Sequence, residues 1–243
     1  MKLVERDAEL AVLTACADRA LTGEGALVVV VGESGAGKTA FVEQFLAERA
    51  GRARTLSAVC DPLATPRPLG PIRDVADGVG EETLRMLSDA EHALDIFDAA
   101  FADLGATPTV LVIDDLQWAD QGTIDMLRFV LRRIHRCPLL VVGIAREEEV
   151  HPAHPMRTLL ADVARSASAH LVSLEPLTLD GVRSWRANRR STVRGFTESL
   201  VVTPSSSPRC STIQLGTYPP RCETRCSAAR SGSTQKHGIC STS

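Results

Sequence analysis

Residues Ala26–Thr39 read Ala-Leu-Val-Val-Val-Val-Gly-Glu-Ser-Gly-Ala-Gly-Lys-Thr, and this stretch decides the fold. Its first part is apolar throughout, which is typical of a strand buried on both faces of a parallel sheet. Its second part, Gly32–Thr39, matches the pattern G-x-x-x-x-G-K-S/T at every fixed position. A helix, expected over Lys38–Ala50, follows at once. The stretch therefore predicts a phosphate-binding loop between a buried strand and a helix.

Each fixed residue of this loop has a physical task. Its glycines permit backbone angles that other residues resist, so that successive N–H groups can point at one anion. The following helix adds the positive end of its dipole. Lys38 supplies a charge near the β- and γ-phosphates, and Thr39 offers a hydroxyl to Mg²⁺. We therefore expect a nucleotide to contact the whole loop and the start of the helix: Gly32, Glu33, Ser34, Gly35, Ala36, Gly37, Lys38, Thr39 and Ala40.

Two neighbouring acids form the second chemical feature. The apolar run Val110–Ile113 ends in Asp114 and Asp115. Because Mg²⁺ prefers a carboxylate beside phosphate oxygens and water, Asp114 suits the metal. Asp115 would then orient or deprotonate the attacking water. Aspartates are also common in solvated turns after strands, so these roles depend on the phosphate loop upstream.

An arginine follows another apolar run. Leu139–Ile144 predicts a strand, and Ala145 and Arg146 come directly after it. If this strand lies between the strands of the first two motifs, Arg146 can reach the γ-phosphate. The other interpretation is a surface arginine paired with the acids of Glu147–Glu149. The residues alone leave both open.

The rest of the chain alternates between strands and helices, which predicts an α/β fold: a three-layer sandwich with a five-stranded parallel sheet. Right-handed crossovers bring the carboxyl ends of the strands, and the ligand, to one edge. Asp61–Pro71 is rich in Pro and Gly and is expected to be a loop. The expected strands are Ala26–Val31, Arg54–Val59, Thr109–Ile113, Leu139–Ile144 and His170–Leu174. The expected helices are Asp7–Ala20, Lys38–Ala50, Ile72–Asp77, Glu82–Leu104, Thr123–His135 and Met156–Arg165.

The composition is that of a globular protein, with 243 residues, 44% hydrophobic content and a net charge of -3. No apolar run has transmembrane length and the N-terminus lacks a signal-peptide pattern, so we expect a cytoplasmic protein with no membrane partner. Cys16, Cys60 and Cys137 lie in apolar segments and are expected to be small buried side chains. The four remaining cysteines lie near the end of the chain, and their spacing fits no zinc site.

These motifs together resemble the signal-transduction ATPases with numerous domains (STAND), a branch of the AAA-like P-loop proteins. The nearest likeness is to the ATPase module of large ATP-binding regulators of the LuxR type. Asp114–Asp120, which reads Asp-Asp-Leu-Gln-Trp-Ala-Asp, is similar to the metal-site signature of that family, and Arg146 stands where the family has its γ-phosphate sensor. The resemblance implies bound ATP and Mg²⁺. It also implies a sheet in which the sensor strand lies between the P-loop strand and the metal-site strand.

The resemblance extends to both ends of the body of the chain. Val4–Leu10 is similar to the family's N-terminal segment near the adenine, which implies that Arg6 belongs to the nucleotide site. Here Glu5 replaces the usual glycine. Leu174–Leu177 resembles the segment that leads into a helical lid. The family's lid then contains Gly-Gly-Asn-Pro-Phe-Phe, which this chain lacks.

The character of the sequence changes near Ser184. Residues 185–243 carry nine Lys or Arg against two acids and are rich in Ser, Thr, Pro and Cys, so we expect a mostly disordered tail. Codons permitted for residues 200–211, read from the third base of Leu200, can give Gly-Gly-Asn-Pro-Phe-Phe-Val-Thr-Glu-Val-Leu. Past Ile213 the same shift permits Leu-Pro-Ala-Thr-Val-Arg-Asp-Ala-Val-Leu. Our hypothesis is a one-base frameshift near Trp185 that replaced the lid and later domains, and the alternative is a genuine low-complexity tail.

Three functions follow from these features. The first is an ATP- and Mg²⁺-binding switch, slowly hydrolysing, of a signal-transduction or transcription regulator, with weak turnover here because lid and output domains are missing. The second is a P-loop kinase for a small molecule, although Glu82–Leu104 supplies no Arg-rich lid. The third is a DNA-binding module, although the body has no basic helix-turn-helix signal. Any contact with DNA would therefore come from a C-terminal domain missing from this chain, and self-association stays open.

Overall fold

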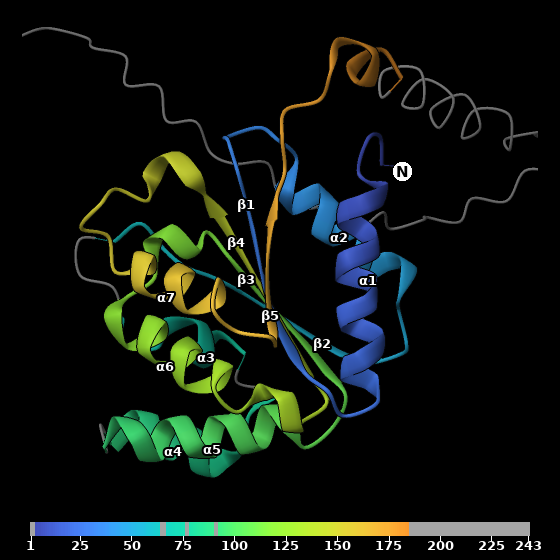
Figure 1. Ribbon diagram of the computed structural model, residues 1–243. Coiled ribbons are helices and arrows are strands. Elements are labelled where there is room, and N and C mark those ends of the chain that lie inside the picture. Colours follow the sequence, from blue (N-terminus) through green and yellow to red (C-terminus); the bar gives the residue numbers. More distant parts are fainter. Residues whose placement is uncertain (1–2, 64–66, 76–77, 90–91, 185–243) are drawn as a thin grey trace, which may run out of the picture. The chain divides into compact units, whose positions relative to one another are not determined.

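A five-stranded, all-parallel sheet forms the centre of the domain (Figure 1). The computed structural model describes residues 3–63, 67–75, 78–89 and 92–184. The strand order is β2-β3-β4-β1-β5, which places β4 between β1 and β3 as predicted. The strands are β1 (Ala26–Gly32), β2 (Arg54–Val59), β3 (Thr109–Asp114), β4 (Leu139–Arg146) and β5 (Ala169–Ser173).

The burial of each strand follows its place in the sheet. β1 and β4 are central and almost wholly buried, which is why both read as unbroken apolar runs. β2 lies at one edge and alternates between more and less exposed residues. The place of each strand in the sheet therefore explains its pattern of apolar and polar residues.

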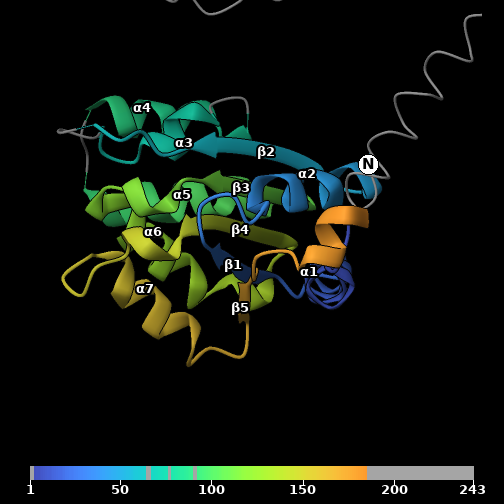
Figure 2. The same ribbon diagram turned by 90° about the horizontal axis from the view of Figure 1, so that it is seen from above.

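Helices cover both faces of the sheet (Figures 1 and 2). α1 (Asp7–Leu21) and α2 (Lys38–Glu48) pack on one face, where Leu13, Phe41 and Phe45 join the sheet in one apolar core. A larger core on the other face takes side chains from the remaining helices. These helices are α3 (Gly70–Asp74), α4 (Glu81–Asp89), α5 (Ala93–Gly105), α6 (Gln121–Leu131) and α7 (Met156–Val163). The predicted three-layer α/β architecture is confirmed.

The expected single helix over Glu82–Leu104 is wrong, because two helices occupy this stretch. His92, just before α5, has an extended backbone with ψ 129°, so α5 starts anew after it. The two helices pack against each other, which brings Leu87 of α4 and Phe97 of α5 into the same core. The expected boundary between the loop ending at Pro71 and the helix beginning at Ile72 also differs from the structure. α3 already begins at Gly70, because proline is well tolerated in the first turn of a helix.

The helix expected over Thr123–His135 is also shorter than predicted. Asp120 caps its start by accepting a hydrogen bond from the Thr123 backbone N–H at 3.1 Å, and α6 ends at Leu131. Arg133 leaves helical geometry at φ −121°, and a 3-10 turn, η3 (Ile134–Arg136), follows. Ile134 is fully buried all the same, since the turn keeps it on the apolar stripe of the helix.

Several expectations concern single residues or the end of the chain. Cys16, Cys60 and Cys137 are buried free cysteines, as predicted. Burial raises the pKa of the Cys60 thiol to about 12, and nearby aspartates add to that effect. The expectations for residues 185–243 lie outside the described residues. Within the described ranges, no helix combines the length and apolar character needed to cross a membrane.

Candidate functional site

The carboxyl ends of β1, β3 and β4 meet at one edge of the sheet and bring the three predicted motifs together. β1 ends at Gly32, which pairs in register with Arg146 at the end of β4. β3, on the other side of β4, ends at Asp114. Because parallel strands all point the same way, the phosphate loop, the two acids and the arginine share this edge. The sheet order alone therefore builds the site.

Close approach and backbone shape both require glycine in the loop. A Cβ atom built on Gly32 would lie 2.5 Å from the backbone oxygen of Leu174, so no side chain fits there. Gly37, which precedes α2, has φ 87°, in the left-handed region that favours glycine. These two residues let the loop turn back over the start of α2.

Lys38 is held inside the loop that it follows. Its side chain is buried, and its Nζ donates to the backbone oxygens of Gly32 and Glu33, both at 2.8 Å. Burial is the main cause of a lowered Lys38 pKa, and it outweighs the opposite effect of nearby carboxylates, of which Glu148 is the largest. The ammonium group is thus already fixed among the loop's carbonyls.

Glu148 is a site residue that sequence reasoning treated only as a surface partner of Arg146. It lies in the 3-10 turn η4 (Glu147–Glu149) after β4, and its Oε1 accepts a hydrogen bond from the Ser34 backbone N–H at 2.8 Å. The pKa of Glu148 is lowered, first by its own backbone N–H, then by that of Ser34 and by the charges of Lys38 and Arg146. A carboxylate is therefore bound to one of the loop's anion donors. The run of three acids directly after β4 was the available signal.

The two predicted metal ligands face each other across the edge. Thr39 Oγ1, at the start of α2, donates to Asp114 Oδ2 at 3.1 Å. The other oxygen, Oδ1, accepts from the backbone N–H of Asp115 at 2.8 Å. The hydroxyl and the carboxylate are both hard oxygen donors, which is the ligand type that Mg²⁺ selects.

Asp115 sits beside Arg146 in a constrained turn. Its backbone has φ 53°, in the left-handed region, where Asp is one of the better tolerated residues. Its Oδ1 lies 3.8 Å from Arg146 Nε, and Arg146 Nη1 donates to Glu149 Oε1 at 3.2 Å. Arg146 thus pairs with one of the following acids, as one interpretation expected, and also lies beside Asp115, while its contact with a γ-phosphate stays a prediction. Its backbone N–H donates to Gln117 Oε1 at 3.0 Å.

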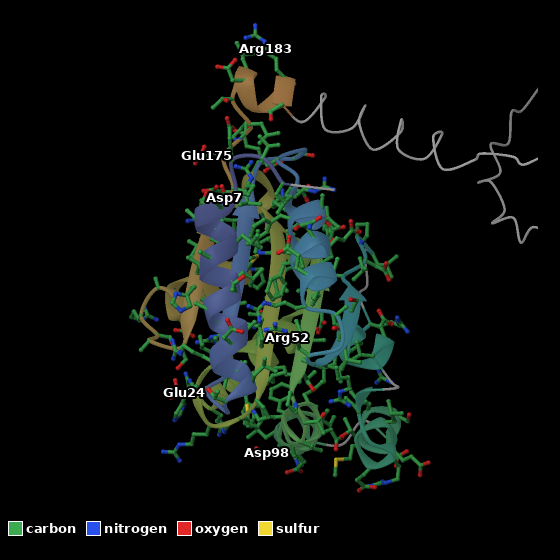
Figure 3. The ribbon with its side chains drawn as sticks, turned by 90° about the vertical axis from the view of Figure 1, so that its right-hand side faces the viewer. Asp7, Glu24, Arg52, Asp98, Glu175 and Arg183 are labelled. Carbon is green, nitrogen blue, oxygen red and sulfur yellow. The ribbon has the colours of Figure 1, made fainter. Side chains whose placement is uncertain are left out.

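Arg6 is buried, and backbone carbonyls take up its donors. The guanidinium donates to the oxygens of Glu5 at 2.9 Å, of Ala36 at 3.4 Å, and of Glu175. Figure 3 shows Asp7 and Glu175 at the same end of the sheet, with Glu24 at the opposite end. Arg6 therefore ties the start of α1 to the phosphate loop and to the segment after β5. Its contact with a nucleotide stays a prediction.

A family comparison agrees with this geometry. Residues 2–142 match the sequence profile of the AAA ATPase domain, and this span is more than half of the chain. The chain belongs to the AAA ATPase family. The matched span of the AAA ATPase domain includes the phosphate loop and both aspartates, and it ends within β4, before Arg146 and Glu148. No curated protein matches the chain.

Solved structures give a further comparison for this AAA ATPase domain. A structure of Drosophila ORC bound to DNA is 16% identical, with a TM-score of 0.44, over 74% of this chain and 44% of that one. Two variants of RuvB from Thermotoga maritima are each 14% identical, with a TM-score of 0.46, over 79% of this chain and 52% of theirs. The chain thus spans about half the length of the solved structures that it matches.

The residues at this edge fit the Mg²⁺ and ATP that AAA ATPase domains generally bind. Thr39 and Asp114 would hold the metal, with the phosphates and water supplying its other ligands. In the described part of the chain, no group of three or more His, Cys, Asp and Glu side chains could form a metal site by itself. A metal that also binds phosphate oxygens and water needs only a small number of protein ligands, and Thr39 and Asp114 supply two.

Proposed function

We propose that the domain binds ATP with Mg²⁺ and hydrolyses it slowly, as the switch of a signal-transduction or transcription regulator of the STAND, LuxR-like type. The observation that carries this proposal is the hydrogen bond from Thr39 to Asp114, which joins the phosphate loop to the acid at the end of β3. A structural turn has no need to pair these two residues. A nucleotide bound with its metal does.

Each site residue predicted from the sequence motifs then has a role in hydrolysis. The amides of the loop and Lys38 bind the phosphates, and Thr39 and Asp114 hold the metal, which would offset the negative charge of the phosphates. Asp115 accepts a proton from the water whose oxygen attacks the γ-phosphorus, while the bond to the β,γ-bridging oxygen breaks and ADP leaves. Arg146, beside Asp115, contacts the γ-phosphate and completes the charge around it.

The regulatory assignment rests on the family resemblance of the motifs rather than on the edge itself. The phosphate loop, the Asp114–Asp120 signature and the position of Arg146 support it. We further propose a cytoplasmic location, and that another domain would make any contact with DNA. For residues 185–243 we propose a shifted reading frame. Resequencing the gene tests that idea, and it fails if no one-base change near codon 185 restores a long open frame.

Binding of a fluorescent ATP analogue tests the core of the proposal. The wild-type protein should bind the analogue more tightly with Mg²⁺ than with a chelator, and Lys38→Ala should lose binding about 10-fold or more. Arg19→Ala is the matched control: it also removes one positive charge, but its partner Glu24 lies at the opposite end of the sheet (Figure 3). Equal affinity of wild type and Lys38→Ala would defeat the proposal.

Phosphate release separates hydrolysis from transfer. Release without any added acceptor, lost in Asp115→Asn, is the expected result, because the amide cannot accept the proton of the attacking water. Label transferred from γ-labelled ATP to an added metabolite, with no release to water, would instead identify a small-molecule kinase.

A further inference from the structure

A buried glutamine lies between the proposed base and the proposed sensor. Gln117 is only 2% exposed and belongs to the 3-10 turn η2 (Leu116–Trp118), directly after the two aspartates. Its side chain links the residue after β3 to the end of β4: Nε2 donates to Asp115 Oδ1 at 2.8 Å, and Oε1 accepts from the backbone N–H of Arg146 at 3.0 Å. The proposed hydrolysis of ATP assigns no role to Gln117.

The two partners fix which way the amide points. The Arg146 N–H can only donate, so the oxygen of Gln117 must face it. The amide nitrogen then faces Asp115, whose Oδ1 is the acceptor. A flipped amide would set oxygen against oxygen at Asp115 and N–H against N–H at Arg146. The side chain thus has one stable orientation, set by the end of β4.

The turn that carries Gln117 is held by other contacts. Leu116 is fully buried and packs directly on Gly143 of β4, where an added Cβ would lie 2.7 Å from Leu116 Cδ2. His154 Nδ1 accepts from the Met156 backbone N–H at 3.1 Å, so its Nε2 carries the proton and donates to the backbone oxygen of Gln117 at 2.8 Å. The side chain of Gln117 is therefore not needed to keep the turn in place.

The effect of Gln117 on Asp115 is directional. Oδ1 of Asp115 receives the amide of Gln117 and faces Arg146 Nε, whereas Oδ2 has no hydrogen-bond partner among the described residues. The Asp115 carboxylate is thus held through Oδ1, and Oδ2 is left to accept a hydrogen bond from a water molecule. A base that rotates freely would spend much of its time in unproductive orientations.

We propose that Gln117 is a positioning residue for ATP hydrolysis. It orients the Asp115 carboxylate and holds it in place beside Arg146. This inference rests on the proposed function. It assigns no contact with the nucleotide to Gln117, so ground-state binding of ATP does not depend on it. Loss of the amide should lower kcat and leave KM for ATP nearly unchanged.

Gln117→Met is the main test, because methionine has a similar length and no hydrogen-bonding amide. Its kcat should fall about 10- to 100-fold, as expected for a misplaced base, with KM within about twofold of wild type. Gln117→Glu is the second variant. It keeps an acceptor for the Arg146 N–H but loses the donor to Asp115, so its kcat should fall as well. Gln121→Met is the matched control, since Gln121 is exposed and bonds to Asp125 on α6.

The possible results are distinct. An unchanged kcat in Gln117→Met, in a protein whose wild-type hydrolysis depends on Lys38 and Asp115, overturns this inference and leaves the proposed function standing. A parallel loss of kcat and of ATP-analogue binding also overturns it, because it would mark a purely structural role. A wild-type protein that binds ATP but releases no phosphate overturns the inference together with the proposed hydrolysis.

Discussion

The carboxylate of Glu148 and the backbone N–H of Ser34 are joined by a hydrogen bond of 2.8 Å. Ser34 lies in the middle of the phosphate loop, and Glu148 comes from the turn after β4, far away in the chain. A negative side chain is thus bound to a donor that a phosphate oxygen would use. If the domain binds triphosphate as proposed, a phosphate oxygen and Glu148 would compete for that donor.

This relationship predicts that Glu148→Gln binds the ATP analogue more tightly than wild type. Removing the charge relieves its repulsion with the phosphates, and the exposed position keeps the gain modest, at about two- to fivefold. Titration of the analogue by fluorescence measures the gain. Glu147→Gln removes the same charge from the neighbouring exposed residue and should change the affinity less. Equal affinities for all three proteins would contradict the competition.

Gly32→Ala should destabilise the domain by about 2–4 kcal/mol and abolish binding of the ATP analogue. The added methyl group would meet the backbone oxygen of Leu174 at 2.5 Å, and neither backbone segment can move without disturbing the sheet. Urea unfolding gives the free energy. Gly23→Ala is the control, because Gly23 also has a positive φ, of 92°, but no atom of the described residues lies within 4 Å of its Cβ position. If the two variants lose equal stability, the close contact at Leu174 has no special cost.

The backbone at Glu5 predicts an unusual order of variant stabilities. Glu5 has φ 56°, in the left-handed region, and its carboxylate accepts from the backbone N–H and the hydroxyl of Thr178. Glu5→Ala and Glu5→Gly lose the same hydrogen bonds, but only glycine is relaxed at this φ. Glu5→Gly should therefore melt a few degrees above Glu5→Ala in a thermal scan. The reverse order would show that this φ is not strained.

Asp162 predicts a pH-dependent contribution to stability. The Arg128 side chain donates to it at 2.7 Å and Arg165 at 2.6 Å, and these bonds, Arg128 first, lower the Asp162 pKa below its ordinary 3.8. A lowered folded-state pKa gives stability that is complete above the unfolded value and is lost as the pH falls through the folded one. Asp162→Asn should thus cost about 1 kcal/mol at pH 7.

Urea unfolding at pH 7 and at several values below pH 4 would follow this contribution. The difference between wild type and Asp162→Asn should shrink as the pH falls below 3.8 towards the folded-state pKa. Asp180→Asn, at an exposed pair with Arg183, is the control and should differ little from wild type at any pH. A difference that stays constant with pH would show that the loss comes from packing rather than from charge.

The sequence was most informative where one residue type is required by chemistry or by burial. The apolar run of β1 and the glycines after it left one interpretation, and the family resemblance implied the position of β4 beside it. Sequence periodicity could not show the break before α5, because Leu87 and Phe97 fit one long helix as well as two shorter ones. The end of α6 was missed for the same reason, since Ile134 continues its apolar stripe.

Glu148 and Gln117 were missed as site residues for a different reason. Their roles depend on partners that lie far away in the chain or on another strand, Ser34 for the first and Arg146 for the second. A glutamate in an acidic run and a glutamine in a turn are common at surfaces. Only the register of β1, β3 and β4 turns these residues toward the loop and the acids.

The buried guanidinium of Arg6 couples the phosphate loop to the segment after β5. The same cation binds a carbonyl of the phosphate loop, at Ala36, and one of the segment after β5, at Glu175. A shift of Ala36 would therefore either move the cation, and with it the backbone of Glu175, or break the hydrogen bond to Ala36. Because the three acceptors are backbone oxygens, the tie made by Arg6 does not depend on the side chains at positions 5, 36 and 175.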